Sequence, residues 1–425
     1  MAATDSATVS PPSRKSLKIV IAVFGSGGDV RPYIILGKAL RARGHEVAVA
    51  VNPYFGPMVH GADLRLIPLG PEQGYLNALK DPNLWHPRRS IQRMFRYMAG
   101  AVPLYWHALY EELKNTDLVI TSSFAIGARF AAEVENVPCV NTHLQPSLFR
   151  SCQDFTLVGP NMKWMRHAPR PAKKAFFALG DRFMNGDPLD RLNDQRPFMG
   201  LELLDDYYSE VMHGGNAVAA LYPEWFAPRQ PDWPENALQF DFLMDPPSLG
   251  NALDPELEAF IQAGTAPVLW TFGTANIQTE KHIALAEETS RTLRQRAIIV
   301  CTAFPKSEAH GEIFHTPFAP FADLIGRCAV VVHHGGIGTI AQCLRAGVRQ
   351  VAVPQAYDQY DNGARLERLG VGRSVNYSSA NAGKLVRAIR HAESVQQETL
   401  DIPKSRFHAD PADPLCAWLE TMAKK

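Results

Sequence analysis

Short apolar runs alternate with helix-like segments along the whole chain, and this alternation constrains the fold more than any other feature. The first half contains IVIAVF, VAVAVN, LVITSS and CVNTHL, and the second half contains PVLWTFG, AIIVCTA, AVVVHH and QVAVPQ. Such runs separated by helices are typical of parallel sheets with crossover connections. The sequence therefore predicts an α/β fold in which two similar α/β domains face each other. We expect a cleft between them, at the carboxyl ends of both sheets.

The Pro-rich stretch WFAPRQPDWPEN separates the two series of runs and is typical of an inter-domain linker. With 425 residues, the chain is long enough for each domain to bury a core of its own. We expect the terminal segment to be helical and to pack back on the N-terminal domain. The predicted parts are a disordered tail at 1–16, an N-terminal α/β domain at 17–226, a linker at 227–237, a C-terminal α/β domain at 238–400 and the terminal segment at 401–425.

Composition excludes several classes of function. The 43 Lys and Arg residues balance 43 Asp and Glu residues, so the chain has no basic field for nucleic acid. No apolar run reaches the length of a membrane span of about 18 residues, and the first residues lack the apolar core of a secretory signal. The 6 cysteines never form C-x-x-C, which favours free thiols in a reducing compartment. We therefore expect a cytoplasmic protein.

The stretch FGSGGDVRPY joins a strand-like run to a helix-like segment that stops at Gly44. It lacks the third glycine of the G-x-G-x-x-G fingerprint, so a dinucleotide cofactor is not expected here. We expect the turn that contains Gly27 and Gly28 to line the cleft between the domains. Two roles remain open for Asp29: it caps the helix, with Pro32 in the first turn, or it takes part in chemistry.

A second glycine-rich turn, HHGGIGT, follows a strand-like run and opens a helix that ends at Gly347. A helix N-terminus with close-approach glycines binds a pyrophosphate through free N–H groups and the helix dipole. We expect the pyrophosphate contacts at His333, Gly335, Gly336 and Thr339. A plain glycine-rich turn with a core histidine is the alternative.

After one more strand, VPQAYDQYDN places two polar residues at the same rim of the cleft. An acid and an amide, Asp358 and Gln359, together hold sugar hydroxyls by paired hydrogen bonds. We expect Asp361 and Asn362 to cap the helix that follows.

The block from Phe318 to Arg365 resembles the donor-site signature of nucleotide-sugar-dependent glycosyltransferases with the GT-B fold, in which two Rossmann-like domains face each other. Its histidine, glycine run, Pro354 and D-Q-x-x-N occur in the order and spacing of that family. GSGGDVRP resembles the opening motif of the bacterial and sterol members, so the resemblance covers nearly the whole chain. LYPEWFAPRQPDWP, DPNLWHP and HGGIGT resemble the rhamnosyltransferases of rhamnolipid synthesis, which use dTDP-rhamnose and a hydroxyacyl lipid.

The resemblance implies that the domain at 17–226 binds the acceptor and that the domain at 238–400 binds the nucleotide sugar. It also implies a role for individual residues. The donor phosphates are assigned to His333, Gly335, Gly336, Thr339 and Thr274, the base and ribose to Phe318, Ala319, Pro320 and Gln342, and the sugar to Asp358 and Gln359. Plant members carry Trp at the position of Phe318, which leaves uracil or thymine open. Many relatives hold the ribose with Glu where this chain has Gln342, so the charge is lost here.

The reaction implied by the resemblance is an inverting transfer of a hexose from dTDP-rhamnose or UDP-glucose to a hydroxyl of a hydrophobic acceptor, with a hydroxyacyl lipid preferred. Such a transfer needs a base, and the resemblance assigns Asp29, whose pKa should rise on partial burial. The helix dipole, the glycine amides and His333 would stabilise the leaving diphosphate. We therefore expect neither a metal nor a cofactor, and the chain contains no D-x-D pair.

Two segments, Trp85–Leu113 and Asn161–Asn185, mix Arg with Met and aromatic residues at helical spacing. They either receive an amphiphilic acceptor and touch the inner membrane surface, or form ordinary domain core with solvated arginines. The expected partners are the nucleotide sugar and a hydrophobic hydroxyl acceptor. The alternatives are a sugar-nucleotide epimerase, transfer of a UDP-sugar to a sterol, polyketide or other aglycone, and a non-enzymatic sugar-nucleotide-binding subunit.

Overall fold

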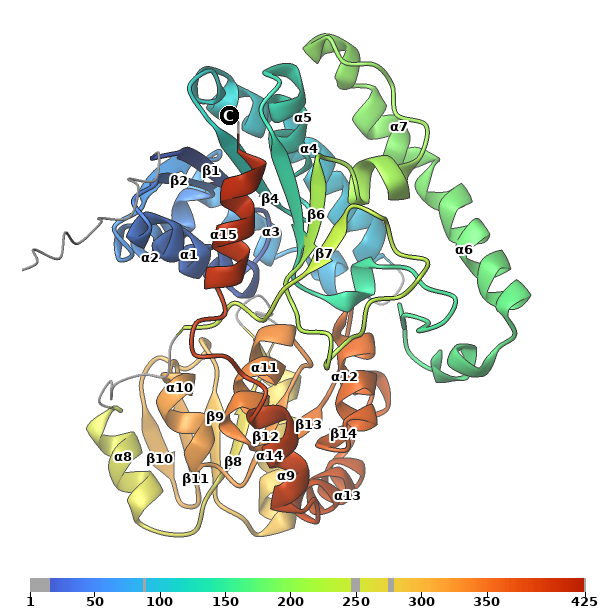
Figure 1. The fold of residues 1–425 in the computed structure, drawn as a ribbon. Coiled ribbons are helices and arrows are strands. Elements are labelled where there is room, and N and C mark those ends of the chain that lie inside the picture. The colour runs from blue at the N-terminus through green and yellow to red at the C-terminus, as the bar shows by residue number, and fades with distance from the viewer. Residues whose placement is uncertain (1–15, 87–88, 246–252, 274–278, 424–425) are drawn as a thin grey trace, which may run out of the picture.

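The computed structural model describes residues 16–86, 89–245, 253–273 and 279–423, which form two α/β domains (Figure 1). In the N-terminal domain the sheet has the strand order β3-β2-β1-β4-β5-β6-β7 and every pairing is parallel. Its strands are β1 Lys18–Ala22, β2 Glu46–Val51, β3 Arg65–Pro68, β4 Leu118–Ser122, β5 Cys139–His143, β6 Ala217–Ala220 and β7 Ala237–Gln239. Its helices are α1 Gly27–Ala42, α2 Gly56–His60, α3 Glu72–Leu79, α4 Ser90–Leu113, α5 Ile126–Val134, α6 Arg170–Met184 and α7 Asp187–Asn193.

The sheet of the C-terminal domain has the order β10-β11-β9-β8-β12-β13-β14. All its pairings are parallel except that of the edge strand β10 with β11. Its strands are β8 Val268–Thr271, β9 Ala297–Val300, β10 Glu308–His310, β11 Ile313–Thr316, β12 Val330–His333, β13 Arg349–Ala352 and β14 Gly372–Ser374. The remaining helices are α8 Pro255–Gln262, α9 Glu280–Leu293, α10 Phe321–Leu324, α11 Ile337–Ala346, α12 Gln359–Arg368, α13 Ala382–Glu393, α14 Gln397–Lys404 and α15 Asp413–Met422.

The apolar runs form the central strands of both sheets. Every residue of β4 and β5 is buried, as is every residue of β8, β9 and β12. Helices on both faces of a parallel sheet leave no solvent-facing side, which explains why these strands read as continuous apolar runs. The predicted α/β class with two parallel sheets is confirmed.

The predicted linker at 227–237 lies inside the N-terminal domain. Residue Ala237 begins β7, which pairs with β6 in the register Val218↔Ala237. Trp233 is 9% exposed and stacks on Phe149 with a centroid distance of 4.3 Å. The proline content suggested a linker, but the apolar residues between the prolines belong to the core. The chain passes to the C-terminal domain only after β7, so that domain does not begin at 238.

The end of the chain divides between the two domains. Helix α14 contacts α11 of the C-terminal domain, whereas α15 contacts α1 of the N-terminal domain (Figure 1). Leu415, Cys416 and Leu419 of α15 are 0% exposed and belong to the core around β1. Arg43 pairs with Glu420 at 2.7 Å. The chain therefore crosses between the domains a second time before it ends. The predicted tail at 1–16 lies outside the described residues except for Ser16.

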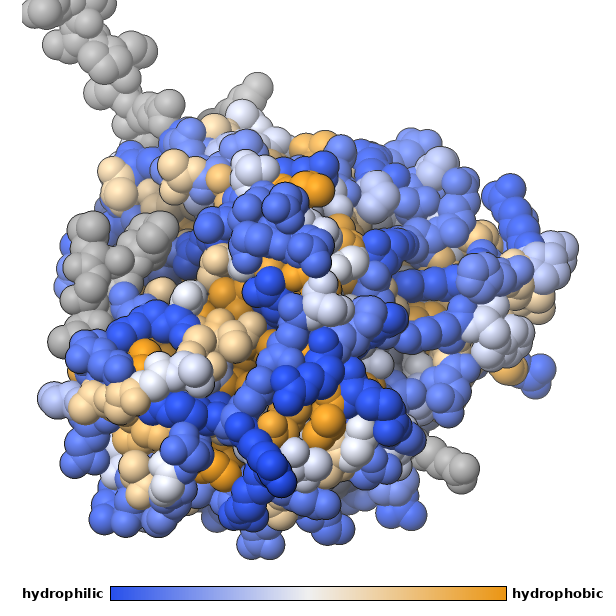
Figure 2. Space-filling view, turned by 90° about the horizontal axis from the view of Figure 1, so that it is seen from below, coloured by the Kyte–Doolittle hydropathy of each residue, from blue (hydrophilic) through white to orange (hydrophobic). Residues whose placement is uncertain are grey.

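The outer surface is mainly hydrophilic where the C-terminal domain is seen from below, with hydrophobic residues showing between the polar ones (Figure 2). Helices α6 and α7 lie along one side of the N-terminal domain (Figure 1). Among the described helices, none combines the length and apolar character that crossing a membrane requires.

Candidate active site

A cavity of about 2040 Å³ lies between the two domains. The β1–α1 turn and α4 line it from the N-terminal domain, and the β12–α11 turn and the start of α12 line it from the C-terminal domain. Both turns follow the carboxyl ends of parallel strands, which is where open α/β sheets bind ligands. The predicted cleft is therefore present. Its lining includes these predicted site residues: Gly27, Gly28, Asp29, Phe318, Ala319, Pro320, Gly336, Thr339, Gln342, Asp358 and Gln359.

Asp29 lies in the first turn of α1, which begins at Gly27, earlier than the sequence pattern indicated. The N-cap is Ser26, and one carboxylate oxygen of Asp29 accepts hydrogen bonds from the Ser26 amide at 2.7 Å and the Ser26 hydroxyl at 2.9 Å. The carboxylate folds back over Gly25, where an added Cβ would lie 2.4 Å from Oδ2. The amide of Asp29 itself also hydrogen-bonds the carboxylate. Asp29 therefore supports the helix start, and it lines the cleft as well.

The N-terminus of α11 opens into the cleft from the opposite domain. Gly335 has a φ of 93°, a conformation that favours glycine, and Gly336 is the N-cap. Gly336 and Thr339 line the cavity. The first amides of a helix lack partners within the helix, so they and the dipole favour an anion here.

The structure does not place the His333 side chain in the cleft. It is 1% exposed, its Nδ1 accepts a hydrogen bond from the Gly335 amide at 3.0 Å, and its Nε2 lies 3.1 Å from Gln350 Oε1. Both ring nitrogens are thus engaged inside the domain, and burial lowers the pKa of His333 to about 3. The expected phosphate contact through His333 is corrected: this residue holds the glycine turn in shape.

His334 is the histidine that lines the cleft. Its ring fits between two glycines, because an added Cβ would lie 2.5 Å from its Nε2 at Gly336 and 2.8 Å from its Cε1 at Gly273. Its Nδ1 is buried and has no hydrogen-bond partner among the described residues. Burial lowers its pKa to about 4, so the ring is neutral at pH 7 and offers one N–H donor. Thr274, expected on the neighbouring loop, lies outside the described residues.

Helix α12 begins at Gln359, one residue after its N-cap Asp358. Asp361 and Asn362 therefore lie inside the helix, and the expectation that they cap it was wrong. Gln359 Oε1 accepts from the amides of Gln355 and Ala356, which precede the helix, at 2.8 and 3.1 Å. Asn362 donates to Asp358 Oδ2 at 2.6 Å.

The two acids of the cleft influence each other. Burial raises the pKa of Asp29, although its hydrogen bonds with Ser26 oppose this. Burial and the negative charge of Asp29 together raise the pKa of Asp358 to about 7. Two carboxylates in one desolvated site disfavour simultaneous ionisation. The cleft therefore holds a pair of acids, one from each domain, that titrate closer to neutrality than exposed acids do.

The loop between β11 and α10 forms the part of the cleft predicted to hold the base. Phe318 is 72% exposed, which leaves its ring available for stacking, while Ala319 is 4% exposed. The Thr316 hydroxyl donates to the Phe318 carbonyl at 2.8 Å and fixes the loop. Gln342 lines the cavity from α11.

The N-terminal part of the cavity is mostly apolar. Met94, Tyr97, Ala101 and Leu104 of α4 line it, so one face of this helix is pocket and the opposite face is core. In contrast, no residue of α6 lines the cavity. The first of the two Arg- and Met-rich segments thus contributes to the pocket, whereas the helix of the second does not.

No group of three or more His, Cys, Asp or Glu residues within the described ranges has the arrangement of a metal site. The site offers instead a helix N-terminus, glycine amides, a neutral histidine and a pair of acids. This combination suits a diphosphate on one side and proton removal on the other.

Two family models match parts of the chain. Residues 19–152 match the glycosyltransferase family 28 N-terminal domain, and residues 306–411 match the erythromycin biosynthesis protein CIII-like, C-terminal domain. The first match includes the turn with Asp29, and the second includes the glycine turn and the start of α12. Both halves of the cleft therefore carry glycosyltransferase signatures.

Relatives and solved structures agree with these matches. O-mycaminosyltylonolide 6-deoxyallosyltransferase of Streptomyces fradiae is 28% identical over 388 residues, which cover 88% of this chain and 90% of the relative. The structure of the glycotransferase of kitacinnamycin superposes with a TM-score of 0.74 at 19% identity, covering 96% of this chain and 100% of that chain. Glycosyltransferase VinC, solved in complex with dTDP, has a TM-score of 0.62 at 19% identity, covering 95% and 100%.

The fold and the cleft define the class: two Rossmann-like domains with a cavity between them. With the two domain matches, the protein is identified as a nucleotide-sugar glycosyltransferase of the GT-B type.

Proposed function

We propose that the protein transfers a hexose, with inversion, from a pyrimidine nucleotide sugar to a hydroxyl group of a hydrophobic acceptor. One observation carries the proposal: Asp29 and the N-terminus of α11 line the same cavity from opposite domains. The first group accepts the hydroxyl proton of the acceptor, and the second stabilises the leaving diphosphate. dTDP-rhamnose and UDP-glucose are the candidate donors. The dTDP complex of VinC and the deoxyhexose in the Streptomyces relative's name support a dTDP-linked donor.

The lining residues divide the donor among them in this scheme. His334, Gly336 and Thr339 contact the diphosphate, Phe318 and the backbone around Pro320 receive the base, and Asp358 and Gln359 bind the sugar. Because the helix dipole and neutral hydrogen-bond donors stabilise the negative charge of the leaving diphosphate, the transfer requires neither a metal nor a cofactor.

The apolar lining near α4 supports a hydrophobic acceptor, and we propose a hydroxyacyl lipid. The Streptomyces relative is named for another kind of acceptor, O-mycaminosyltylonolide, so aglycones such as sterols and polyketides are the second candidates.

The test is release of nucleoside diphosphate and formation of glycoside by the purified protein. dTDP-rhamnose and UDP-glucose are offered with a 3-hydroxyacyl lipid, a sterol, a polyketide aglycone or no acceptor, with and without a chelator. Acceptor-dependent release, an inverted anomeric configuration in the product and an unchanged rate with chelator are expected. Turnover of the donor without acceptor would indicate an epimerase or hydrolase, and nucleotide binding without turnover would indicate a binding subunit.

The rate should depend on the ionisation of Asp29. A base must be deprotonated, so kcat/KM should fall as the pH drops through the pKa of Asp29, which burial raises above the ordinary value of an aspartate. The negative charge of Asp29 contributes to the raised pKa of Asp358, so Asp29 ionises first and Asp358 is still neutral where Asp29 titrates. Asp358→Asn should therefore leave the acid limb where it is. The measurement is the pH profile of kcat/KM for both proteins. A limb that moves to lower pH in Asp358→Asn would contradict this order of ionisation.

We also propose that helix α6 of the N-terminal domain touches the inner membrane surface. Leu179 and Phe183 of this helix are 69% and 51% exposed, and Arg182 lies beside them in sequence. An exposed apolar stripe with basic neighbours binds an anionic lipid surface. Co-sedimentation with vesicles containing anionic lipid should be lost in Leu179→Asp/Phe183→Asp, and equal binding by this variant and the native protein would refute the contact.

A further inference from the structure

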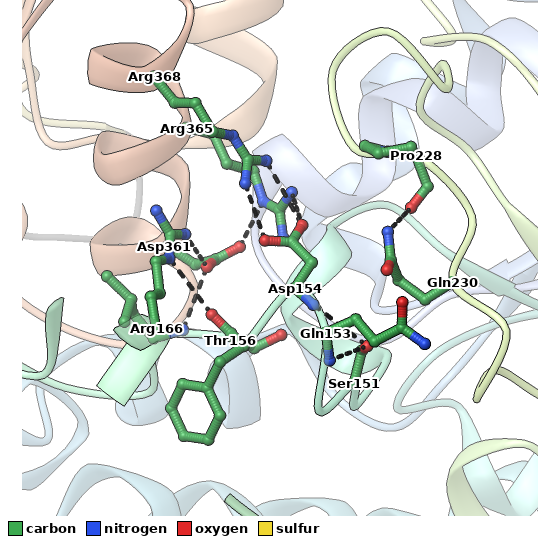
Figure 3. Close-up of polar contacts among 12 residues, drawn as sticks. Ser151, Gln153, Asp154, Thr156, Arg166, Pro228, Gln230, Asp361, Arg365 and Arg368 are labelled. Carbon is green, nitrogen blue, oxygen red and sulfur yellow. Dashed lines mark hydrogen bonds and ion pairs between the residues drawn. The ribbon is translucent and has the colours of Figure 1, made fainter. Parts of the chain in front are cut away.

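A cluster of buried charged residues joins residues 151–168 of the N-terminal domain to α12 of the C-terminal domain. Asp361 and Arg365 on α12 are 0% and 2% exposed. Asp154 and Arg166 come from the N-terminal segment. Figure 3 shows Arg365 and Arg368 reaching Asp154 from the helix, and Asp361 facing Arg166.

Every buried charge of this cluster has a partner on the opposite domain. Asp361 accepts from Arg166 at 3.0 Å and from the Leu157 amide at 3.1 Å, besides Arg365 of its own helix at 2.6 Å. Asp154 accepts from Arg365 and from Arg368, each at 2.8 Å. Burial alone would raise the pKa of Asp154, but the two arginines hold it at about 2.

Apolar contacts cover the same face of the helix. Phe155, Leu157 and Met165 of the N-terminal segment form one buried cluster with Tyr360 and Ala364 of α12. Buried charges are costly unless both partners are present, so the ion pairs favour one relative placement of the segment and the helix.

The first turn of the same helix reaches the cleft. Asp358 and Gln359 line the cavity, and Asn362 donates both to Asp358 at 2.6 Å and to the Gly335 carbonyl at 3.0 Å. A helix of this length moves as one body, so contacts at Asp361 and Arg365 fix the position of its first turn.

We propose that Asp154 and Arg166 are positioning residues for the donor sugar, because they hold α12 where Asp358 and Gln359 meet that sugar. The N-terminal domain thus takes part in recognising the donor without touching it. This inference rests on the proposed function, in which the first turn of α12 binds the sugar. The diphosphate site at α11 is built within the C-terminal domain, and α12 reaches its glycine turn through the hydrogen bond of Asn362 to the Gly335 carbonyl, so the site depends on the cluster less directly than the sugar contacts do.

The test compares the binding of dTDP-rhamnose or UDP-glucose with that of free dTDP or UDP, measured by titration calorimetry on the full chain. For Asp154→Asn we expect the affinity for the nucleotide sugar to fall about tenfold, while that for the free diphosphate falls much less. Arg368→Met removes only the half-exposed partner of Asp154, so its effect should be smaller. The control is Arg191→Met, which breaks the exposed pair with Asp187 on α7 and should change neither affinity.

A purely structural role would lower the melting temperature of Asp154→Asn and leave both affinities unchanged. An equal loss of both affinities would also overturn the proposal, because it would show a general disturbance of the donor domain. Binding is measured without turnover, so failure of the proposed transfer appears separately, as a native protein that binds the nucleotide sugar but forms no glycoside.

Discussion

Asp29→Asn should reduce kcat about 10³-fold, which corresponds to roughly 4 kcal/mol of transition-state stabilisation. The amide keeps an oxygen that accepts from Ser26, so the start of α1 is preserved, but it cannot take the proton of the acceptor hydroxyl. Binding of free dTDP or UDP should be unchanged because the diphosphate site lies on the other domain. Steady-state transfer and calorimetric binding measure the two effects.

Two control variants distinguish a catalytic role of Asp29 from its role in capping α1. Asp29→Ala loses the hydrogen bonds as well as the charge, and we expect it to lower the free energy of unfolding by about 1 kcal/mol, with the same loss of rate as the Asn variant. Ser26→Ala removes a hydroxyl partner but leaves the carboxylate, so it should keep most of the activity. An Asp29→Asn enzyme that retained transfer would reduce Asp29 to a helix-capping residue.

His334→Ala should reduce kcat about 10²-fold, because it removes a fixed donor from the place where charge develops on the leaving diphosphate. The ring occupies the space between Gly273 and Gly336, so the smaller side chain creates no clash. We expect a weaker affinity for free dTDP or UDP as well. The measurements are steady-state transfer and binding of the diphosphate by calorimetry.

The adjacent histidine provides the matched control. His333→Phe keeps the ring volume but loses the hydrogen bond from the Gly335 amide, so it should mainly lower the melting temperature. If His333→Phe lost activity at a temperature where it is folded while His334→Ala remained active, the assignment of His334 to the diphosphate would be wrong.

Much of the fold could be predicted because local pattern and global architecture agree. Runs such as LVITSS and AVVVHH became central strands, since buried parallel strands need apolar residues on both faces. The boundary at 227–237 failed for a physical reason. Prolines there shape a loop within the N-terminal domain, and Trp233 is held by Phe149, a residue far away in the sequence.

The site was predictable at the level of segments, and less so at the level of single side chains. Strand periodicity could not separate His333 from His334, because both faces of the sheet are covered and the turn at Gly335 decides which ring enters the cleft. The role of Asp361 depends on Asp154 and Arg166 of the other domain, whose partners a local pattern does not reveal. Residue type and spacing define a turn, whereas long-range packing orients it.

The return of α15 to the N-terminal domain bears on chimeric enzymes. A fragment cut after β7 would lack Leu415, Cys416 and Leu419, and would expose the apolar surface that these side chains cover on the N-terminal domain. A hybrid that exchanges C-terminal domains between relatives must therefore replace an internal stretch and keep both ends of the N-terminal domain from one parent. The segment to exchange in this protein is therefore internal, and a single cut that replaces the whole C-terminal half does not suffice.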